Sequence, residues 1–119
     1  MANILLAEDD SSMREFLARA LRRAGHEVAA VGDGLAALET IEQQAFDLLL
    51  ADVVMPGMDG IELARRAAKE QSGIKVMFIT GFAAVALNSD SDAPKNAKVL
   101  SKPVHLRELV SEVNKMLAA

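Results

Sequence analysis

The chain has 119 residues, of which 51% are hydrophobic, and a formal net charge of −4. That length and composition suit one domain with a single core. The sequence has no cysteine, which excludes disulfides, thiolate zinc sites and a cysteine nucleophile. Lysine and arginine are dispersed, and there is no Tyr or Trp, so we expect no nucleic-acid binding.

Five apolar runs alternate with stretches of helical periodicity along the chain. This alternation is typical of βαβ units around a parallel sheet, so we predict an α/β fold. Right-handed crossovers favour a single flavodoxin-like, doubly wound (βα)5 domain with strand order 2-1-3-4-5. We expect it to span 1–119 with no output domain, so that its own surface carries the output. The runs lie near residues 3–7, 28–31, 47–51, 75–79 and 97–100.

The predicted helices carry apolar stripes and recognisable ends. Ser12 and Glu15 fit a capping box at the start of the first helix, and Gly25 fits a left-handed cap at its end. Asp59 is expected to cap the third helix. We predict a short helix and a loop over residues 83–96. The stripes are Met13, Phe16, Leu17, Ala20, Leu21 and Ala24 in the first helix, Leu35, Leu38 and Ile41 in the second, Leu63, Ala64 and Ala67 in the third, and Leu106, Leu109, Val110, Val113 and Leu117 in the last.

No apolar run approaches the roughly 18 to 20 residues that a membrane-spanning helix needs. The N-terminus also lacks the basic and apolar pattern of a signal peptide. We therefore expect a cytoplasmic protein without membrane insertion.

Polar groups follow four of the five apolar runs. Glu8 and Asp9 follow the first, Asp52 the third, Thr80 the fourth and Lys102 the fifth. Ligands in an open parallel sheet sit beyond the carboxyl ends of the strands, so we expect these groups to meet. Acids held close together repel one another unless a cation joins them, and Mg²⁺ suits a small cluster of this kind.

With Mg²⁺ bound, Asp52 can act as a nucleophile toward phosphorus. The transition state spreads charge over equatorial phosphoryl oxygens, so catalysis rests on positioning and on cations. Lys102 would supply the second cation, and Thr80 a hydroxyl donor to the phosphoryl group. Any one of the acids alone is better explained as a solvated loop residue, whereas their joint occurrence at four strand ends indicates a site.

Over its full length the sequence resembles response-regulator receiver domains. The matching motifs are Glu8-Asp9, Asp52, Met55-Pro56 with Asp59-Gly60, Thr80 and Lys102-Pro103. The resemblance implies that Asp9 and Asp52 bind Mg²⁺ together with the main-chain carbonyl of Val54, while Glu8 acts nearby or through water. It also implies a cis Lys102–Pro103 bond. The protein would then be a phosphorylated switch rather than an enzyme, catalysing only its own phosphoryl transfer and slow autodephosphorylation.

Two segments, 80–89 and 101–109, further resemble single-domain cell-cycle regulators of this family. That resemblance implies phosphorylation by a histidine phosphotransferase or a sensor histidine kinase, and recruitment to a cell pole. It also implies binding to ClpX and the ClpXP protease, with its substrates or adaptors, by the unphosphorylated form. The C-terminal Leu117, Ala118 and Ala119 resemble a degron that ClpX engages, but a helix that simply frays in small residues explains them equally well.

Two features depart from the commoner receiver pattern. Val99 stands where many receivers carry an aromatic switch residue, so we expect other residues to transmit the signal. Val54 and Phe82 are apolar at the positions that tune phosphoaspartate hydrolysis in the family, and neither can hydrogen-bond an attacking water. We therefore expect slow spontaneous dephosphorylation. The expected switch and partner surface comprises Phe82, Val85, Leu87, Val99 and Pro103.

Two other functions stay open. An Mg²⁺-dependent aspartyl phosphohydrolase would need a second acid two residues after the nucleophile, where Val54 stands, and a cap domain to enclose a substrate. A phosphate shuttle or sink within a phosphorelay is compatible with every residue of the predicted site.

Overall fold

The computed structural model describes residues 2–81 and 96–118. Its five parallel strands form one sheet in the order β2-β1-β3-β4-β5, which confirms the predicted α/β topology. The observed boundaries lie within one residue of the predicted ones. The strands are β1 (Asn3–Ala7), β2 (Glu27–Val31), β3 (Leu48–Ala51), β4 (Lys75–Thr80) and β5 (Lys98–Ser101).

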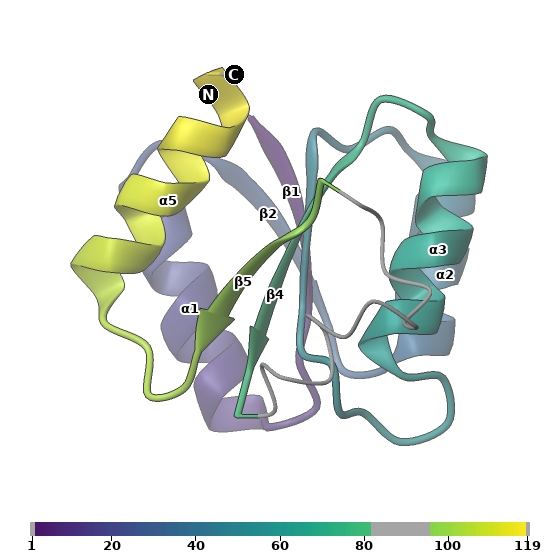
Figure 1. Ribbon diagram of the computed structural model, residues 1–119, viewed down its shortest axis with the longest axis horizontal. Coiled ribbons are helices and arrows are strands. Elements are labelled where there is room, and N and C mark those ends of the chain that lie inside the picture. Colours follow the sequence, from purple (N-terminus) through teal and green to yellow (C-terminus); the bar gives the residue numbers. More distant parts are fainter. Residues whose placement is uncertain (1, 82–95, 119) are drawn as a thin grey trace.

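The four helices with described bounds form two layers, one on each face of the sheet (Figure 1). Helices α1 (Ser11–Arg23) and α5 (Leu106–Ala118) cover one face. Helices α2 (Gly34–Gln43) and α3 (Gly60–Glu70) cover the other. None of these helices is both long and apolar enough to cross a membrane, among the residues that the structure describes.

The sheet is buried on both faces, which explains its nearly continuous apolar strands. Successive side chains of a strand point to opposite faces, so β3 feeds both halves of the core. Leu49 packs with the α2 and α3 residues Ala37 and Leu63. Leu48 and Leu50 pack on the other side with α1 and α5 residues such as Leu17 and Leu109.

The start of α1 corrects the predicted capping box of Ser12 and Glu15. The N-cap is Asp10, whose backbone is extended and whose carboxylate accepts a hydrogen bond from Met13 N at 2.9 Å. Ser11 already begins the helix, so Ser12 lies within its first turn. The predicted cap of α3 is confirmed, because the Asp59 carboxylate accepts from Glu62 N at 2.8 Å.

Most residues of the predicted apolar stripes face the core, but some residues at the edges of these stripes are exposed. Leu35 is 61% exposed and Phe16 is 48% exposed. In α2 the predicted Ile41 is buried and the predicted Leu38 packs partly buried against the core, and the core contact also includes Ala37, which was not predicted. Gly25 has a φ of 97°, which confirms the left-handed cap after α1. The helix and loop predicted over 83–96 fall outside the described residues, apart from residue 96.

Candidate functional site

The register of the sheet brings the predicted site residues to one edge. Ala7 of β1 pairs with Ala51 of β3, so Glu8 and Asp52 leave neighbouring strands at the same level. The link is direct, since Asp52 N donates to Ala7 O at 3.1 Å. On the far side of β3, Thr80 of β4 pairs with Ser101 of β5, and Lys102 follows at once. The carboxyl ends of β1, β3, β4 and β5 thus form one edge.

Three carboxylates gather at this edge. Glu8, Asp9 and Asp52 each offer one oxygen, and these oxygens all lie within 4.8 Å of one another. Glu8 is 2% exposed and Asp52 is 7% exposed, whereas Asp9 faces solvent. Two buried acids with a third at the opening make a donor set that fits a hard, oxygen-preferring cation which keeps several waters.

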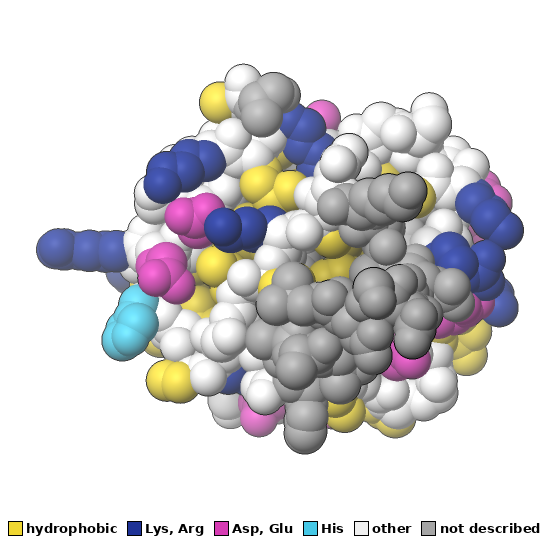
Figure 2. Space-filling model, viewed as in Figure 1, with side chains coloured by type: hydrophobic (Ala, Val, Ile, Leu, Met, Phe, Trp, Pro, Cys, Tyr) yellow, Lys and Arg dark blue, Asp and Glu magenta, His cyan; other side chains and the backbone are white. Residues whose placement is uncertain are grey.

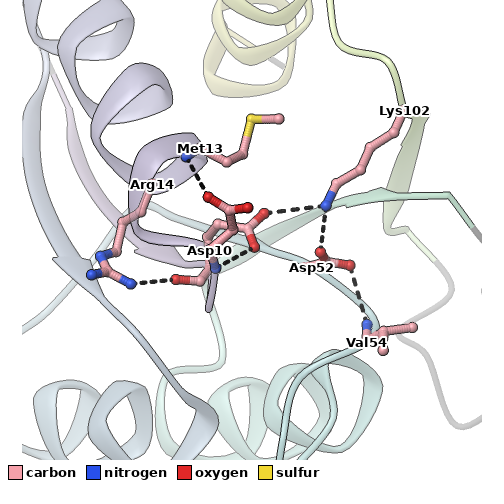
Figure 3. Close-up of polar contacts among 7 residues, drawn as sticks. Asp10, Met13, Arg14, Asp52, Val54 and Lys102 are labelled. Carbon is pink, nitrogen blue, oxygen red and sulfur yellow. Dashed lines mark hydrogen bonds and ion pairs between the residues drawn. The ribbon is translucent and has the colours of Figure 1, made fainter.

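The ammonium group of Lys102 completes the cluster. Its Nζ lies 2.6 Å from Asp52 Oδ2 and 3.4 Å from Glu8 Oε1 (Figure 3). The Lys102–Pro103 peptide bond that follows is cis, as the family resemblance implied. Burial by itself would lower the pKa of Lys102, but its hydrogen bond to Asp52 and the nearby charge of Glu8 outweigh burial and raise that pKa. The side chain therefore stays cationic.

Glu8 is held in place on two sides. Its Oε2 accepts a hydrogen bond from Asp10 N at 3.1 Å, while Oε1 faces Lys102. Burial raises the pKa of Glu8, the charge of Asp52 adds to the rise, and the Asp10 amide and Lys102 only partly offset it. A proton and a cation would therefore compete for this pocket.

The two oxygens of Asp52 have different partners. Val54 N donates to Oδ1 at 3.1 Å, and Lys102 contacts Oδ2 (Figure 3). The Val54 side chain points outward and is 53% exposed. Thr80 is completely buried at the end of β4, on the same edge of the sheet. The Asp52 carboxylate is thus fixed in orientation within the carboxylate cluster.

Two residues support the site in ways that the sequence analysis missed. Arg14 of α1 donates through Nη1 to the main-chain oxygen of Glu8 at 2.8 Å, which pins the loop after β1 (Figure 3). A Cβ on Gly60 would lie 2.1 Å from the main-chain oxygen of Asp52. Gly60 stood in the Asp59-Gly60 motif, which marked its importance without revealing this contact. Arg14 offered no comparable signal among the arginines of its helix.

Four of the predicted switch and tail residues are described, and none of these four belongs to the carboxylate cluster. Val99 is half-buried against the core beneath α2 and α3, and Pro103 is exposed. Leu117 packs against the core on the α1 and α5 side, and Ala118 is exposed. The predictions for Phe82, Val85, Leu87 and Ala119 lie outside the described residues.

An open parallel sheet in the order 2-1-3-4-5, with a carboxylate cluster at its topological switch point, defines a flavodoxin-like α/β domain whose ligands bind at that edge. The response regulator receiver domain model matches residues 4–114, and the chain belongs to that family. It is similar to the response regulator receiver protein CpdR of Brucella abortus (strain 2308), with 61% identity over 119 residues. That match covers 100% of this chain and 99% of CpdR.

One longer relative and two solved structures contain a similar domain. Sensor kinase CckA of Brucella abortus (strain 2308) is 36% identical over 118 residues. That match covers 98% of this chain but only 12% of the kinase. A crystal structure of the receiver domain of hybrid histidine kinase CckA has a TM-score of 0.84 at 34% identity, covering 97% of this chain and 98% of that one. Response regulator protein TrrA of Thermotoga maritima, in complex with Mg²⁺ and BeF, has a TM-score of 0.86 at 27% identity, covering 98% and 99%.

Proposed function

We propose that the chain is a single-domain response regulator, residues 1–119, that accepts a phosphoryl group on Asp52. The observation that carries this proposal is the pocket itself. The Asp52 carboxylate is nearly buried, shares a 4.8 Å cluster with Glu8 and Asp9, and contacts the Lys102 ammonium at 2.6 Å. The structural likeness to TrrA, which is held in complex with Mg²⁺ and BeF, supports the same chemistry here.

Asp9 and Asp52, with the main-chain carbonyl of Val54, are the proposed ligands of Mg²⁺. Glu8 lies within reach of the same ion, and when bound the ion supplies charge that stabilises the phosphoryl oxygens. An Asp52 oxygen attacks phosphorus as the bond to the donor nitrogen breaks, and the donor imidazole recovers a proton. Lys102 then transfers its contact from the Asp52 carboxylate to a phosphoryl oxygen, and the Thr80 hydroxyl donates a hydrogen bond to another phosphoryl oxygen.

Phosphorylation with a small donor tests this assignment. Purified protein incubated with phosphoramidate and Mg²⁺ should gain one phosphoryl group by intact-protein mass spectrometry, and EDTA should prevent the gain. Asp52→Asn should gain none. Asp47→Asn is the matched control, because Asp47 precedes β3 at the opposite end of the sheet, where its carboxylate accepts from Asn3 N at 2.8 Å. Labelling of Asp52→Asn would refute the assignment.

The proposed phosphodonor is a histidine phosphotransferase or sensor histidine kinase, and the proposed output is regulated proteolysis by ClpXP in the cell cycle. The full-length similarity to CpdR supports both proposals. In a reconstituted assay with ClpXP and candidate substrates or adaptors, the unphosphorylated protein should accelerate degradation, and the phosphorylated protein should not. Equal degradation in both states would contradict the switch and favour a phosphate shuttle or sink.

A slow loss of the phosphoryl group is also proposed. Val54 projects an exposed apolar side chain beside Asp52 and offers no hydrogen bond to an attacking water. The isolated phosphoprotein with Mg²⁺ should therefore outlast the time scale of seconds, and Val54→Asn should shorten its lifetime. Val54→Ala is the control, since it changes size without adding a polar group.

The C-terminal Leu117, Ala118 and Ala119 are proposed as a degron. Leu117 packs against the core, so an unfoldase would have to release the last turn of α5 before gripping the chain. Two aspartates added after Ala119 should block turnover of the protein itself by purified ClpXP. Unchanged turnover would remove this proposal. A cytoplasmic location with recruitment to a cell pole also stays a prediction.

A further inference from the structure

A groove runs between α1 and α5, the two helices that lie side by side on one face of the sheet (Figure 1). It is shallow and open to solvent, with a volume of about 840 Å³. Its lining is mainly apolar, with Ala20 and Ala24 on the α1 side and Leu106 and Val110 on the α5 side. Val110 is only half-buried and Ala24 is exposed, although both belong to the predicted apolar stripes of their helices. The stripes are therefore wider than the contact between the helices requires.

The rim of this α1–α5 groove is cationic. Arg23 lines it from α1, and Arg107 and Lys115 line it from α5, while none of its lining residues is acidic. Lys115 also approaches Glu112 at 3.5 Å, which leaves the two arginines as the main source of positive charge. The whole chain has a net charge of −4, so this groove differs in sign from the molecule as a whole. Figure 2 shows Lys and Arg side chains over α5, one of them projecting from the left margin, with Asp or Glu side chains between them.

We propose that the α1–α5 groove binds an acidic amphipathic helix of a partner protein. An apolar floor selects an apolar stripe, and a cationic rim selects carboxylates on either side of that stripe. The 13 residues of α5 extend for about 20 Å, which matches three to four turns of a third helix laid along the groove.

The groove is separate from the acceptor pocket. None of Glu8, Asp9, Asp52 and Lys102 lines it. Binding here therefore adds a second recognition surface to the proposed function and does not depend on it. A failed test of this groove would leave the phosphoacceptor assignment intact.

A second copy of the chain is the main competing occupant. Helix α2 carries the 61% exposed Leu35 and the exposed Glu39 one turn later. Insertion of α2 into the groove of another copy would join two different surfaces, and such contacts propagate into open chains unless the rotation closes. Growth in mass with concentration, by analytical ultracentrifugation, would overturn the proposal of a separate partner.

Two matched synthetic helices provide the test. Both carry one leucine stripe, flanked by glutamates in the first peptide and by lysines in the second. Titration of the ¹⁵N-labelled protein should shift the amides of Ala20, Ala24, Val110 and Ser111 with the glutamate peptide, and salt should weaken the effect. Arg23→Glu combined with Arg107→Glu should weaken this binding about tenfold or more and favour the lysine peptide.

Two further variants complete the design. Arg66→Glu combined with Lys69→Glu changes charge equally on α3 and should leave binding unchanged. Ser111→Trp should block the groove from an exposed position without altering phosphorylation by phosphoramidate. Equal binding of both peptides, or shifts centred outside α1 and α5, would overturn the proposal.

Discussion

At the scale of single residues, the proposed acceptor site combines a charge pair with a close backbone contact. Lys102 lies 2.6 Å from Asp52, and removing one member of a buried pair leaves an uncompensated charge. The backbone of Asp52 is positioned just as tightly, because Gly60 at the start of α3 touches its carbonyl and donates from its own N to Val53 O at 2.9 Å. The start of α3 therefore directly supports Asp52, the proposed nucleophile.

Gly60→Ala is predicted to destabilise the protein and to impair phosphorylation together. The added Cβ would meet Asp52 O at 2.1 Å, so β3 or α3 must shift, at a cost of about 1–3 kcal/mol. Urea unfolding measures the first effect, and the rate of labelling by phosphoramidate measures the second.

Gly73→Ala is the control for this prediction. A Cβ at Gly73 would have no neighbour within 4 Å, so its stability and labelling rate should match those of the wild type. A Gly60→Ala protein that unfolds and reacts like the wild type would show that the backbone contact is not tight.

The sequence predicted the residues of the pocket because the topology of a parallel sheet dictates where strand ends meet. Glu8, Asp52, Thr80 and Lys102 each follow an apolar run, and the observed register places them on one edge. Arg14 and Gly60 could not be found in the same way. Their roles depend on contacts with main-chain oxygens of Glu8 and Asp52, which a residue pattern does not encode.

At the scale of elements, helix α1 shows how a cap and a site can share one residue. Asp10 accepts from Met13 N through its carboxylate, and its own N donates to the Glu8 carboxylate. The same turn therefore starts the helix and orients an acid of the pocket. The predicted capping box failed because Asp10 and Ser12 are both good N-caps, and only the backbone conformation distinguishes them.

Asp10→Ala is predicted to destabilise the fold by about 1 kcal/mol, the usual cost of losing an N-cap. Ser12→Ala should change stability little, because Ser12 lies inside the first turn and is exposed. Guanidinium unfolding of both variants tests the assignment. A larger loss in Ser12→Ala than in Asp10→Ala would restore the capping box.

The side chain of Gln71 joins three backbone groups that follow or end α2. Its Oε1 accepts from Phe46 N at 2.8 Å, and its Nε2 donates to Ile41 O at 2.9 Å and to Gln44 O at 2.8 Å. No periodicity predicts such a link, since Gln71 follows α3 and its partners lie 25 to 30 residues away. The α2 and α3 layer is thus fixed by one polar side chain as well as by packing.

Gln71→Ala is predicted to cost about 1–3 kcal/mol, because it removes two partly buried hydrogen bonds that each contribute about 0.5–1.5 kcal/mol. Urea unfolding measures the loss. Gln43→Ala is the control, since Gln43 is exposed at the end of α2. Equal stability of both variants would mean that water replaces the Gln71 contacts without loss.

Among the features of the helices, the burial of residues at the edges of the apolar stripes was the hardest to predict. Leu35 and Phe16 fit the period of their helices but lie largely exposed, whereas the small Ala37 and Ala18 are buried. Hydrophobicity marks the face of a helix toward the core, but the distance between helix and sheet decides which size of side chain fits there. That distance is a tertiary property.

At the scale of the whole molecule, the carboxylate site and the chain ends lie at opposite ends of the sheet. The carboxyl ends of the strands hold the acidic pocket, and both chain ends lie at the opposite side (Figure 1). Concentrating three acids at one edge makes the metal-free protein sensitive to pH and to cations. Both ligands act on the same carboxylates, so their effects on stability should oppose each other.

Ionisation of Glu8 should lower the free energy of unfolding of the metal-free protein as pH rises. Burial raises the pKa of Glu8 above its ordinary value of 4.5. Between 4.5 and the raised value, the native protein binds a proton that the unfolded chain has released, so the free energy of unfolding falls with increasing pH. Glu8→Gln removes this titration. In EDTA, the stability of the wild type relative to Glu8→Gln should therefore decrease across this interval.

Mg²⁺ should reverse that trend, because a cation stabilises the ionised carboxylates that repel one another in its absence. At a concentration 100 times its Kd, the ion should add about 2.7 kcal/mol to the wild type, and this gain should disappear on acidification as protons displace it. Asp9→Asn and Asp52→Asn should both reduce the gain, whereas Asp47→Asn should retain it. Urea unfolding across pH, with Mg²⁺ or EDTA, measures both effects. A gain from Mg²⁺ that persists at acidic pH, or that survives in Asp52→Asn, would place the ion outside this pocket.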